Sequence, residues 1–155
     1  MTLLLCLLLG FCNGLRSLTA PAAVCWAAHL GWLNFAGTRF SFLHSRITLI
    51  VLTILAVLEL VGDKLPQTPP RTAPLGLIAR MVLGTWCGIA LAMGSGHAFL
   101  APALAGFVGA LAGTFAGYHA RRALVRQSHL PDFVVALAED AIAIAGSLLI
   151  VSHVL

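Results

Sequence analysis

Charged residues are scarce in this sequence: only 9% of its 155 residues are Asp, Glu, Lys or Arg. A soluble domain usually carries about 25% charged residues, which cover much of its surface. Hydrophobic residues make up 60% of the chain, and the mean hydropathy is +1.00. These proportions exclude a soluble globular enzyme, a disordered chain and a nucleic-acid-binding domain. They predict an integral membrane protein whose main partner is the lipid bilayer.

The sequence also lacks the motifs of enzymes and of metal sites. It contains no GxSxG, HExxH or Walker sequence, so we expect neither an enzyme nor a bound cofactor. None of the four cysteines belongs to a CxxC pair, and the histidines are not spaced as metal ligands. All four cysteines lie in apolar runs, where we interpret them as small buried hydrophobic residues.

Apolar runs predict an all-α protein with about six transmembrane or half-spanning helices. The runs comprise residues 2–15, 18–36, 47–62, 75–95, 98–118 and 132–155. The first run is short, because a full span needs about 20 apolar residues. Polar breaks at 37–46 and 119–131, and a Pro-rich connector at 66–74, separate the runs. Strands are not expected, because the apolar blocks are continuous.

A shift of 81 positions aligns the two halves of the chain. Ala-Pro-Ala at 20–22 then falls on Ala-Pro-Ala at 101–103, and Glu59 falls on Asp140. We therefore predict one membrane domain, 1–155, built from repeats 1–65 and 75–155 around the connector 66–74. With three crossings in each repeat, the second would be inverted relative to the first, as in many transporters.

Basic residues predict the orientation. With six spans, one side carries Arg16, Lys64, Arg71, Arg121, Arg122 and Arg126, and the other carries Arg39 and Arg46. Because basic loops remain in the cytoplasm, we predict a multi-pass protein of the inner membrane with both termini in the periplasm. A re-entrant pair within residues 2–36 would change this count.

Two adjacent acids, Glu139 and Asp140, are the strongest functional signal. They lie well inside the last apolar run, and no basic residue is within a helical turn of them. A charge near a helix centre costs about 3 kcal/mol, so such groups usually face a bundle interior or water. One interpretation is a site for a cation or a proton. The other is a pair of buried acids bridged to Arg16 or Arg80 on another helix.

Glu59 and Asp63 form a second acidic pair. They are four residues apart and therefore share one helix face. Asp63 precedes Lys64, so we expect it at the membrane interface, either as a site residue or as a solvated helix end. Glu59 lies one turn deeper and is a candidate site residue.

Breaks in the apolar pattern carry two further candidates. Gly14 permits a break before Arg16, and Ser17 or Thr19 is expected to cap the following helix. Arg16 would either favour an anion near that helix N-terminus or be the counter-ion of a membrane carboxylate. His97 follows two glycines at the equivalent break, as a titrating group or as a polar turn residue.

Glycines follow one face of the fifth apolar run. Gly109, Gly113 and Gly117 are each four residues apart. This small-xxx-small pattern lets helix backbones approach closely. It predicts tight packing, either inside the bundle or between two copies in a homodimer.

The motif GLRS, the ending GDKLP of the third run and the Pro-rich connector together resemble a known family. It is a family of small bacterial integral membrane proteins of unknown function. The residues that carry the resemblance are Gly14, Leu15, Arg16, Ser17, Pro21, Asp63, Lys64 and Pro66. The resemblance implies a membrane location and points to Arg16 and Asp63, but it implies no activity.

The residues favour a small membrane transporter or channel for a cation or a proton-coupled solute. Its site would lie near the midplane at the repeat interface, with candidate residues Arg16, Glu59, Asp63, His97, Glu139 and Asp140. Arg16 keeps an anionic substrate open as a variant. The alternative is a non-transporting accessory subunit that packs through its Gly-rich helix. A transporter should place Glu59 and Asp140 on a wet cavity, and an accessory protein should hold them in closed salt bridges.

Overall fold

The computed structural model describes residues 1–64, 73–128 and 131–154. Its elements are α1 (Thr2–Leu15), α2 (Thr19–His29), the short 3-10 helix η1 (Ser41–His44), α3 (Arg46–Gly62), α4 (Pro74–Gly94), α5 (Leu100–Ser128) and α6 (Asp132–Ser152). The described residues contain no strand. The prediction of an all-α chain is therefore confirmed.

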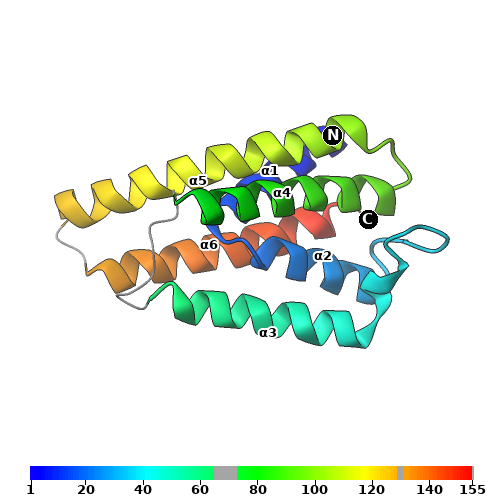
Figure 1. Ribbon diagram of the computed structural model, residues 1–155, viewed down its shortest axis with the longest axis horizontal. Coiled ribbons are helices and arrows are strands. Elements are labelled where there is room, and N and C mark those ends of the chain that lie inside the picture. Colours follow the sequence, from blue (N-terminus) through cyan, green and yellow to red (C-terminus); the bar gives the residue numbers. More distant parts are fainter. Residues whose placement is uncertain (65–72, 129–130, 155) are drawn as a thin grey trace.

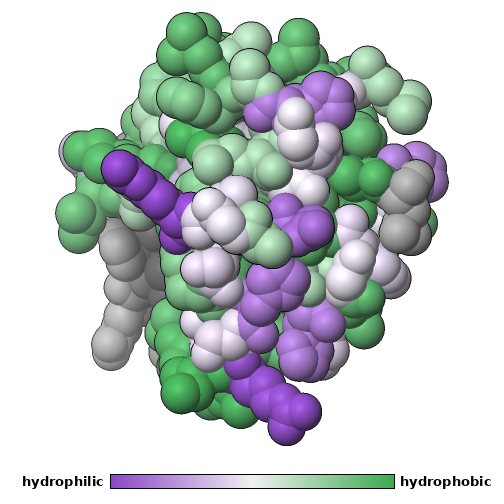
Figure 2. Space-filling view, turned by 90° about the vertical axis from the view of Figure 1, so that its right-hand side faces the viewer, coloured by the Kyte–Doolittle hydropathy of each residue, from purple (hydrophilic) through white to green (hydrophobic). Residues whose placement is uncertain are grey.

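The helices form an elongated bundle and run along its axis in alternating directions (Figure 1). Three of them, α4, α5 and α6, are long and apolar enough to cross a membrane. Exposed hydrophobic side chains cover the outer faces, for example Ile47 of α3, Val82 of α4 and Ile142 of α6. At the end of the bundle that carries the termini, hydrophilic residues gather across the middle and hydrophobic residues surround them (Figure 2). This distribution fits a bundle with lipid around its sides and water at its end.

The first two helices form a hairpin that turns back inside the bundle. The 14 residues of α1 and the 11 residues of α2 are about 21 Å and 17 Å long. Both are shorter than the hydrocarbon core of about 30 Å. α1 starts at the end that holds both termini, and α2 returns toward that same end (Figure 1). Arg16, between the two helices, lies at the buried tip of this hairpin.

Glycines bring α1 and α5 into backbone contact, and α1 also packs against α4 and α6. A Cβ atom on Gly113 would lie 2.1 Å from the Phe11 carbonyl oxygen, and one on Gly109 would lie 2.1 Å from the Leu7 carbonyl oxygen. These two glycines of the predicted stripe therefore pack in the bundle interior, against α1. In this structure α1 covers the face that a homodimer through them would need.

Two helix boundaries differ from the sequence expectation. The run 18–36 was expected to continue as one helix, but α2 ends at His29 and the chain turns at Gly31, whose φ is +79°. Glycine adopts this left-handed conformation without steric cost, so it stops the helix. The polar break 119–131 is helical up to Ser128 as part of α5. That stretch contains Ala, Arg, Leu and Gln, which favour helix, and neither Gly nor Pro before Pro131.

Candidate functional site: a buried charge network

Arg16 is the centre of a charge network at the tip of the α1–α2 hairpin. Its side chain is fully buried, and its Nε donates a hydrogen bond of 2.6 Å to Oδ1 of Asp140. Its Nη1 donates to Oδ2 of Asp63. Arg16 is therefore the counter-ion of two carboxylates, one at the end of α3 and one within α6. Of the two roles considered for Arg16, these contacts agree with the counter-ion of a membrane carboxylate.

Lys64 completes the network from the other side. Its Nζ lies 2.9 Å from Oδ2 of Asp140 and 5.8 Å from the ring centre of Phe133. Each carboxylate oxygen of Asp140 thus faces a different cation. We call the chain of contacts Asp63–Arg16–Asp140–Lys64 the Arg16 network.

Glu59 binds the start of α2. Its two carboxylate oxygens accept hydrogen bonds of 2.7 Å from the backbone N–H groups of Ser17 and Leu18. The N-terminus of a helix carries partial positive charge and unpaired N–H groups, so a carboxylate is favourable there. The expectation that Ser17 or Thr19 caps this helix was wrong: no side-chain cap is present, and Thr19 Oγ1 instead donates to the Arg16 carbonyl at 3.2 Å.

A second group of charges extends the network toward the surface. Arg121 of α5 makes two hydrogen bonds, of 2.8 and 2.6 Å, to the carboxylate of Asp132. Its Nη1 is also 4.0 Å from Oε2 of Glu139. Side-chain exposure rises from 7% at Asp140, through 10% at Glu139 and 19% at Arg121, to 61% at Asp132. The charges therefore form a graded series from the bundle interior to its surface.

All five acidic residues of the chain belong to this region. The region lies where α3 ends, because Asp63 is the residue that caps the C-terminus of α3. α5 and α6 continue beyond that level (Figure 1). The network thus lies toward one end of α3, whereas a midplane position was expected from the sequence.

His97 does not join the other candidates. It is exposed in the turn between α4 and α5, and this turn lies at the end of the bundle that carries the termini (Figure 1). The network lies toward the opposite end. Of the two interpretations of His97, its position agrees with the polar turn residue.

Lys64 and Arg121 were not selected as site residues from the sequence. Lys64 directly follows Asp63, which suggested a solvated helix end, and Arg121 lies in a stretch interpreted as a loop. The composition of the sequence offered one usable signal for Arg121. The stretch 119–128 is rich in residues that favour helix, and a helix that continues through it is what allows α5 to position Arg121.

The described part of the chain contains no group of three His, Cys, Asp or Glu residues that could hold a metal ion. The free and buried cysteines are Cys6, Cys12, Cys25 and Cys87. Their burial confirms the interpretation as small core residues. Ion pairs and backbone N–H groups are the contacts that the structure shows for the carboxylates.

The fold and this network define a class: an all-helical membrane protein with a charge network buried at the tip of a short helical hairpin. The chain belongs to the family described as Domain of unknown function (DUF4126), which matches residues 3–155. This match agrees with the expected uncharacterised family. No curated protein and no solved structure matches the chain.

Proposed function

We propose that this protein is a small membrane transporter or channel for a proton, a cation or a proton-coupled solute, with the Arg16 network as its ion site. The observation that carries the proposal is that all five acids lie in the region of a buried arginine, two of them in direct contact with it, in a chain with only 9% charged residues. Ionisable groups within a membrane bundle commonly mark ion pathways and proton relays.

Stability alone is a weak reason to keep such a network. Removing two charges from water costs several kcal/mol per ion, and the attraction between them only partly offsets this cost. Well-packed hydrophobic residues of similar volume are often as stabilising as a buried ion pair. A network with Arg16 fully buried and Asp140 nearly so therefore favours a role in function.

The network also holds the C-terminal end of α3. α3 packs against α2 and η1, and its C-terminal end is held through Glu59, Asp63 and Lys64. Protonation of Asp140 would remove the charge that attracts Arg16 and Lys64. That end of α3 would then be held less tightly, and water or an ion would gain access to Arg16.

The charge balance favours a cation or a proton as the transported species. Even when the buried Arg80 is counted with Arg16, Lys64 and Arg121, four cations stand against five carboxylates, which gives 4 − 5 = −1. A net negative site attracts cations. The graded exposure from Asp132 to Asp140 provides a charged route from the surface to the interior.

We further propose the orientation with both termini in the periplasm of an inner-membrane protein. Since the hairpin returns to its own side, Arg16 no longer counts as a loop charge. Five basic residues, Lys64, Arg71, Arg121, Arg122 and Arg126, then remain against Arg39 and Arg46; Arg71 lies outside the described residues. The excess still supports the cytoplasmic location of the network end.

The inverted repeat also remains a proposal. Pro21 and Pro102 are each the third residue of a helix, α2 and α5 respectively, which supports it. The acids that the repeat aligns have different contacts, because Glu59 binds backbone N–H groups and Asp140 binds Arg16 and Lys64. Any duplication has therefore diverged at its charged residues.

An accessory, non-transporting role is the second candidate. One observation favours it: the acid–base pairs are closed, with Asp140 in contact with two cations. Packing against a partner through Gly109 and Gly113 is not supported, because α1 covers both glycines.

Asp140→Asn in proteoliposomes tests the proposal. The amide keeps an acceptor for Arg16, and Asp63 still neutralises Arg16, so we expect the protein to fold. Proton uptake and Na⁺ or K⁺ flux should be lost. Arg39→Gln is the control, because Arg39 is an exposed charged residue outside the network, and it should retain flux.

A triple variant separates transport from structure. Arg16→Leu with Asp63→Leu and Asp140→Leu replaces Arg16 and both of its carboxylate partners by hydrophobic residues, which the accessory role should tolerate. A folded triple variant without flux supports the transport site. Flux at the wild-type rate in Asp140→Asn, or no flux of any of the three ions in the unaltered protein, would contradict the proposal.

A further inference from the structure

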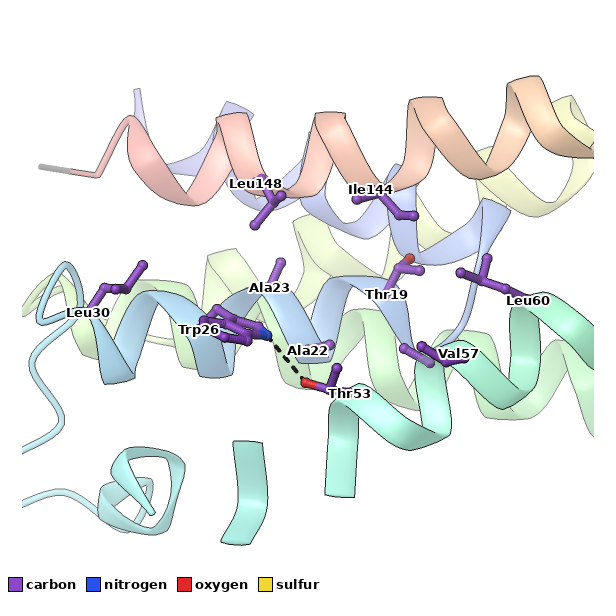
Figure 3. Close-up of a pocket in the computed structure, with 11 residues that line it drawn as sticks. Thr19, Ala22, Ala23, Trp26, Leu30, Thr53, Val57, Leu60, Ile144 and Leu148 are labelled. Carbon is purple, nitrogen blue, oxygen red and sulfur yellow. Dashed lines mark hydrogen bonds between the residues drawn. The ribbon is translucent and has the colours of Figure 1, made fainter. Parts of the chain in front are cut away.

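An apolar groove of about 350 Å³ opens between α2, α3 and α6. Ala22 and Ala23 of α2 lie between Val57 and Leu60 of α3 on one side and Ile144 and Leu148 of α6 on the other (Figure 3). The small alanine side chains leave the space that larger residues would fill. The outer faces of α3 and α6 are covered by exposed hydrophobic residues, so the groove faces the lipid.

The polar groups in the groove bond to the protein itself. Trp26 Nε1 donates to Thr53 Oγ1 at 3.2 Å, and Thr53 Oγ1 donates to the Leu49 carbonyl at 2.7 Å (Figure 3). The Thr19 hydroxyl donates to the Arg16 carbonyl. An occupant of the groove therefore meets mainly hydrocarbon, and an apolar chain fits this surface better than a polar solute.

Groove residues recur along one face of α2, from Thr19 to Leu30. Eleven helical steps measure about 17 Å. One leaflet of a hydrocarbon core of about 30 Å measures about 15 Å. The groove therefore has the length of one lipid acyl chain within a single leaflet.

A charged pair continues the groove at one end. Asp140 precedes the groove residue Ile144 by four positions on α6, and residues four apart share a helix face. Lys64 lies in the turn that follows α3, four positions after the groove residue Leu60. The contact between Lys64 and Asp140 thus lies in line with the groove, one turn beyond its apolar lining.

We propose that this groove binds an anionic phospholipid, with one acyl chain along α2 and the headgroup phosphate at Lys64. A lysine ammonium has three N–H donors, so the phosphate joins Asp140 as a partner of Lys64, whose side chain is 25% exposed. The exposed Arg122 and Arg126 add positive charge to the α5 end beyond the level of the network. The lipid site shares Lys64 with the Arg16 network, but it does not rest on the transport proposal.

Quenching of Trp26 fluorescence by brominated lipids tests the site. The protein is prepared with Trp32→Phe and Trp86→Phe, so that Trp26 is the remaining tryptophan. It is reconstituted with a small fraction of either phosphatidylglycerol or phosphatidylcholine brominated in the acyl chains. We expect phosphatidylglycerol to occupy the groove about fivefold more strongly, the contribution of one lysine near an anionic headgroup.

Matched variants assign the effect to the groove and to its charged end. Lys64→Gln should abolish the preference, whereas Arg39→Gln, a change at an exposed basic residue in the loop between α2 and η1, should retain it. Val57→Phe fills the groove and should reduce quenching by both lipids. Val51→Phe is the control, because Val51 is an exposed residue of α3 that is not part of the lining.

Three results would overturn the proposal. Equal quenching by the two lipids would mean ordinary contact with the bilayer. Unchanged quenching in Val57→Phe would place the lipid elsewhere. No quenching by either lipid would mean that protein, such as a second copy of this chain, covers the groove. Ion flux is not measured in this experiment, so its result is independent of whether the protein transports ions.

Discussion

Two side chains, Glu59 and Arg16, make contacts that connect different helices. Glu59 pairs with two N–H groups at the start of α2 from a different helix, where a local Ser or Thr cap is the common solution. Arg16 joins a carboxylate of α3 to one of α6. At the residue scale, three helices are therefore fixed to each other through two side chains.

Glu59→Gln should destabilise the protein by about 1–3 kcal/mol. The amide presents one acceptor and one donor, so one of the N–H groups of Ser17 and Leu18 loses its partner, and the charge-assisted bonds are lost. Thermal unfolding in detergent measures the effect. Asp132→Asn is the same chemical change at an exposed ion pair and should cost less than about 1 kcal/mol. Equal losses in the two variants would show that the contact of Glu59 with α2 contributes little.

At the scale of elements, the contact between α1 and α5 depends on the absence of side chains. The two helices meet through Gly10, Gly14, Gly109 and Gly113, whose Cβ positions would overlap backbone atoms of the facing helix. Close approach of helices through small residues is typical of membrane bundles. This contact holds α1, and with it Arg16, at the centre of the bundle.

Gly113→Ala should separate α1 from α5 and lower the stability by about 1–3 kcal/mol, the usual cost of overpacking. The added Cβ would lie 2.1 Å from the Phe11 carbonyl oxygen, a backbone atom that cannot rotate away. Gly62→Ala in α3 is the control, because no atom of the described residues lies within 4 Å of its Cβ position. Both variants are compared by thermal unfolding in detergent. A Gly113→Ala protein as stable as Gly62→Ala would contradict the tight α1–α5 contact.

At the scale of the whole molecule, the charges are separated along the bundle axis. Every acid lies in the region where α3 ends, and both termini lie at the other end (Figure 1). The basic residues near the acids outnumber those near the termini. This asymmetry determines how the bundle is expected to insert.

Reporter fusions at Arg39 and Arg122 test the orientation. We expect Arg122 to give a cytoplasmic signal and Arg39 a periplasmic one, because an excess of basic residues favours a cytoplasmic location for the network end. A fusion after His153 should report the same side as Arg39, since the C-terminus and the loop that follows α2 lie at the same end of the bundle (Figure 1). An active cytoplasmic reporter at Arg39 would reverse the assignment.

Local properties of the sequence determined the membrane class, the number of helices and the break near Arg16. Apolar content adds up residue by residue, and a helix satisfies its own backbone hydrogen bonds, so both can be predicted from short stretches. For the same reason Glu59, Asp63, Glu139 and Asp140 were recognisable as unusual: each is an acid within or beside an apolar run. Helix ends were less predictable, as the early end of α2 at His29 shows, because a glycine turn competes with a run of apolar residues.

Only the tertiary structure decided which groups meet. Asp140 appeared to lack a basic neighbour, yet Arg16, 124 positions away in sequence, is its partner. His97 aligned with Arg16 in the sequence but lies toward the opposite end of the bundle. The glycine stripe fitted two surfaces equally well until α1 was found against it. Such pairings depend on how whole helices pack, and the free energy of that packing comes from contacts between distant segments that no single stretch of sequence contains.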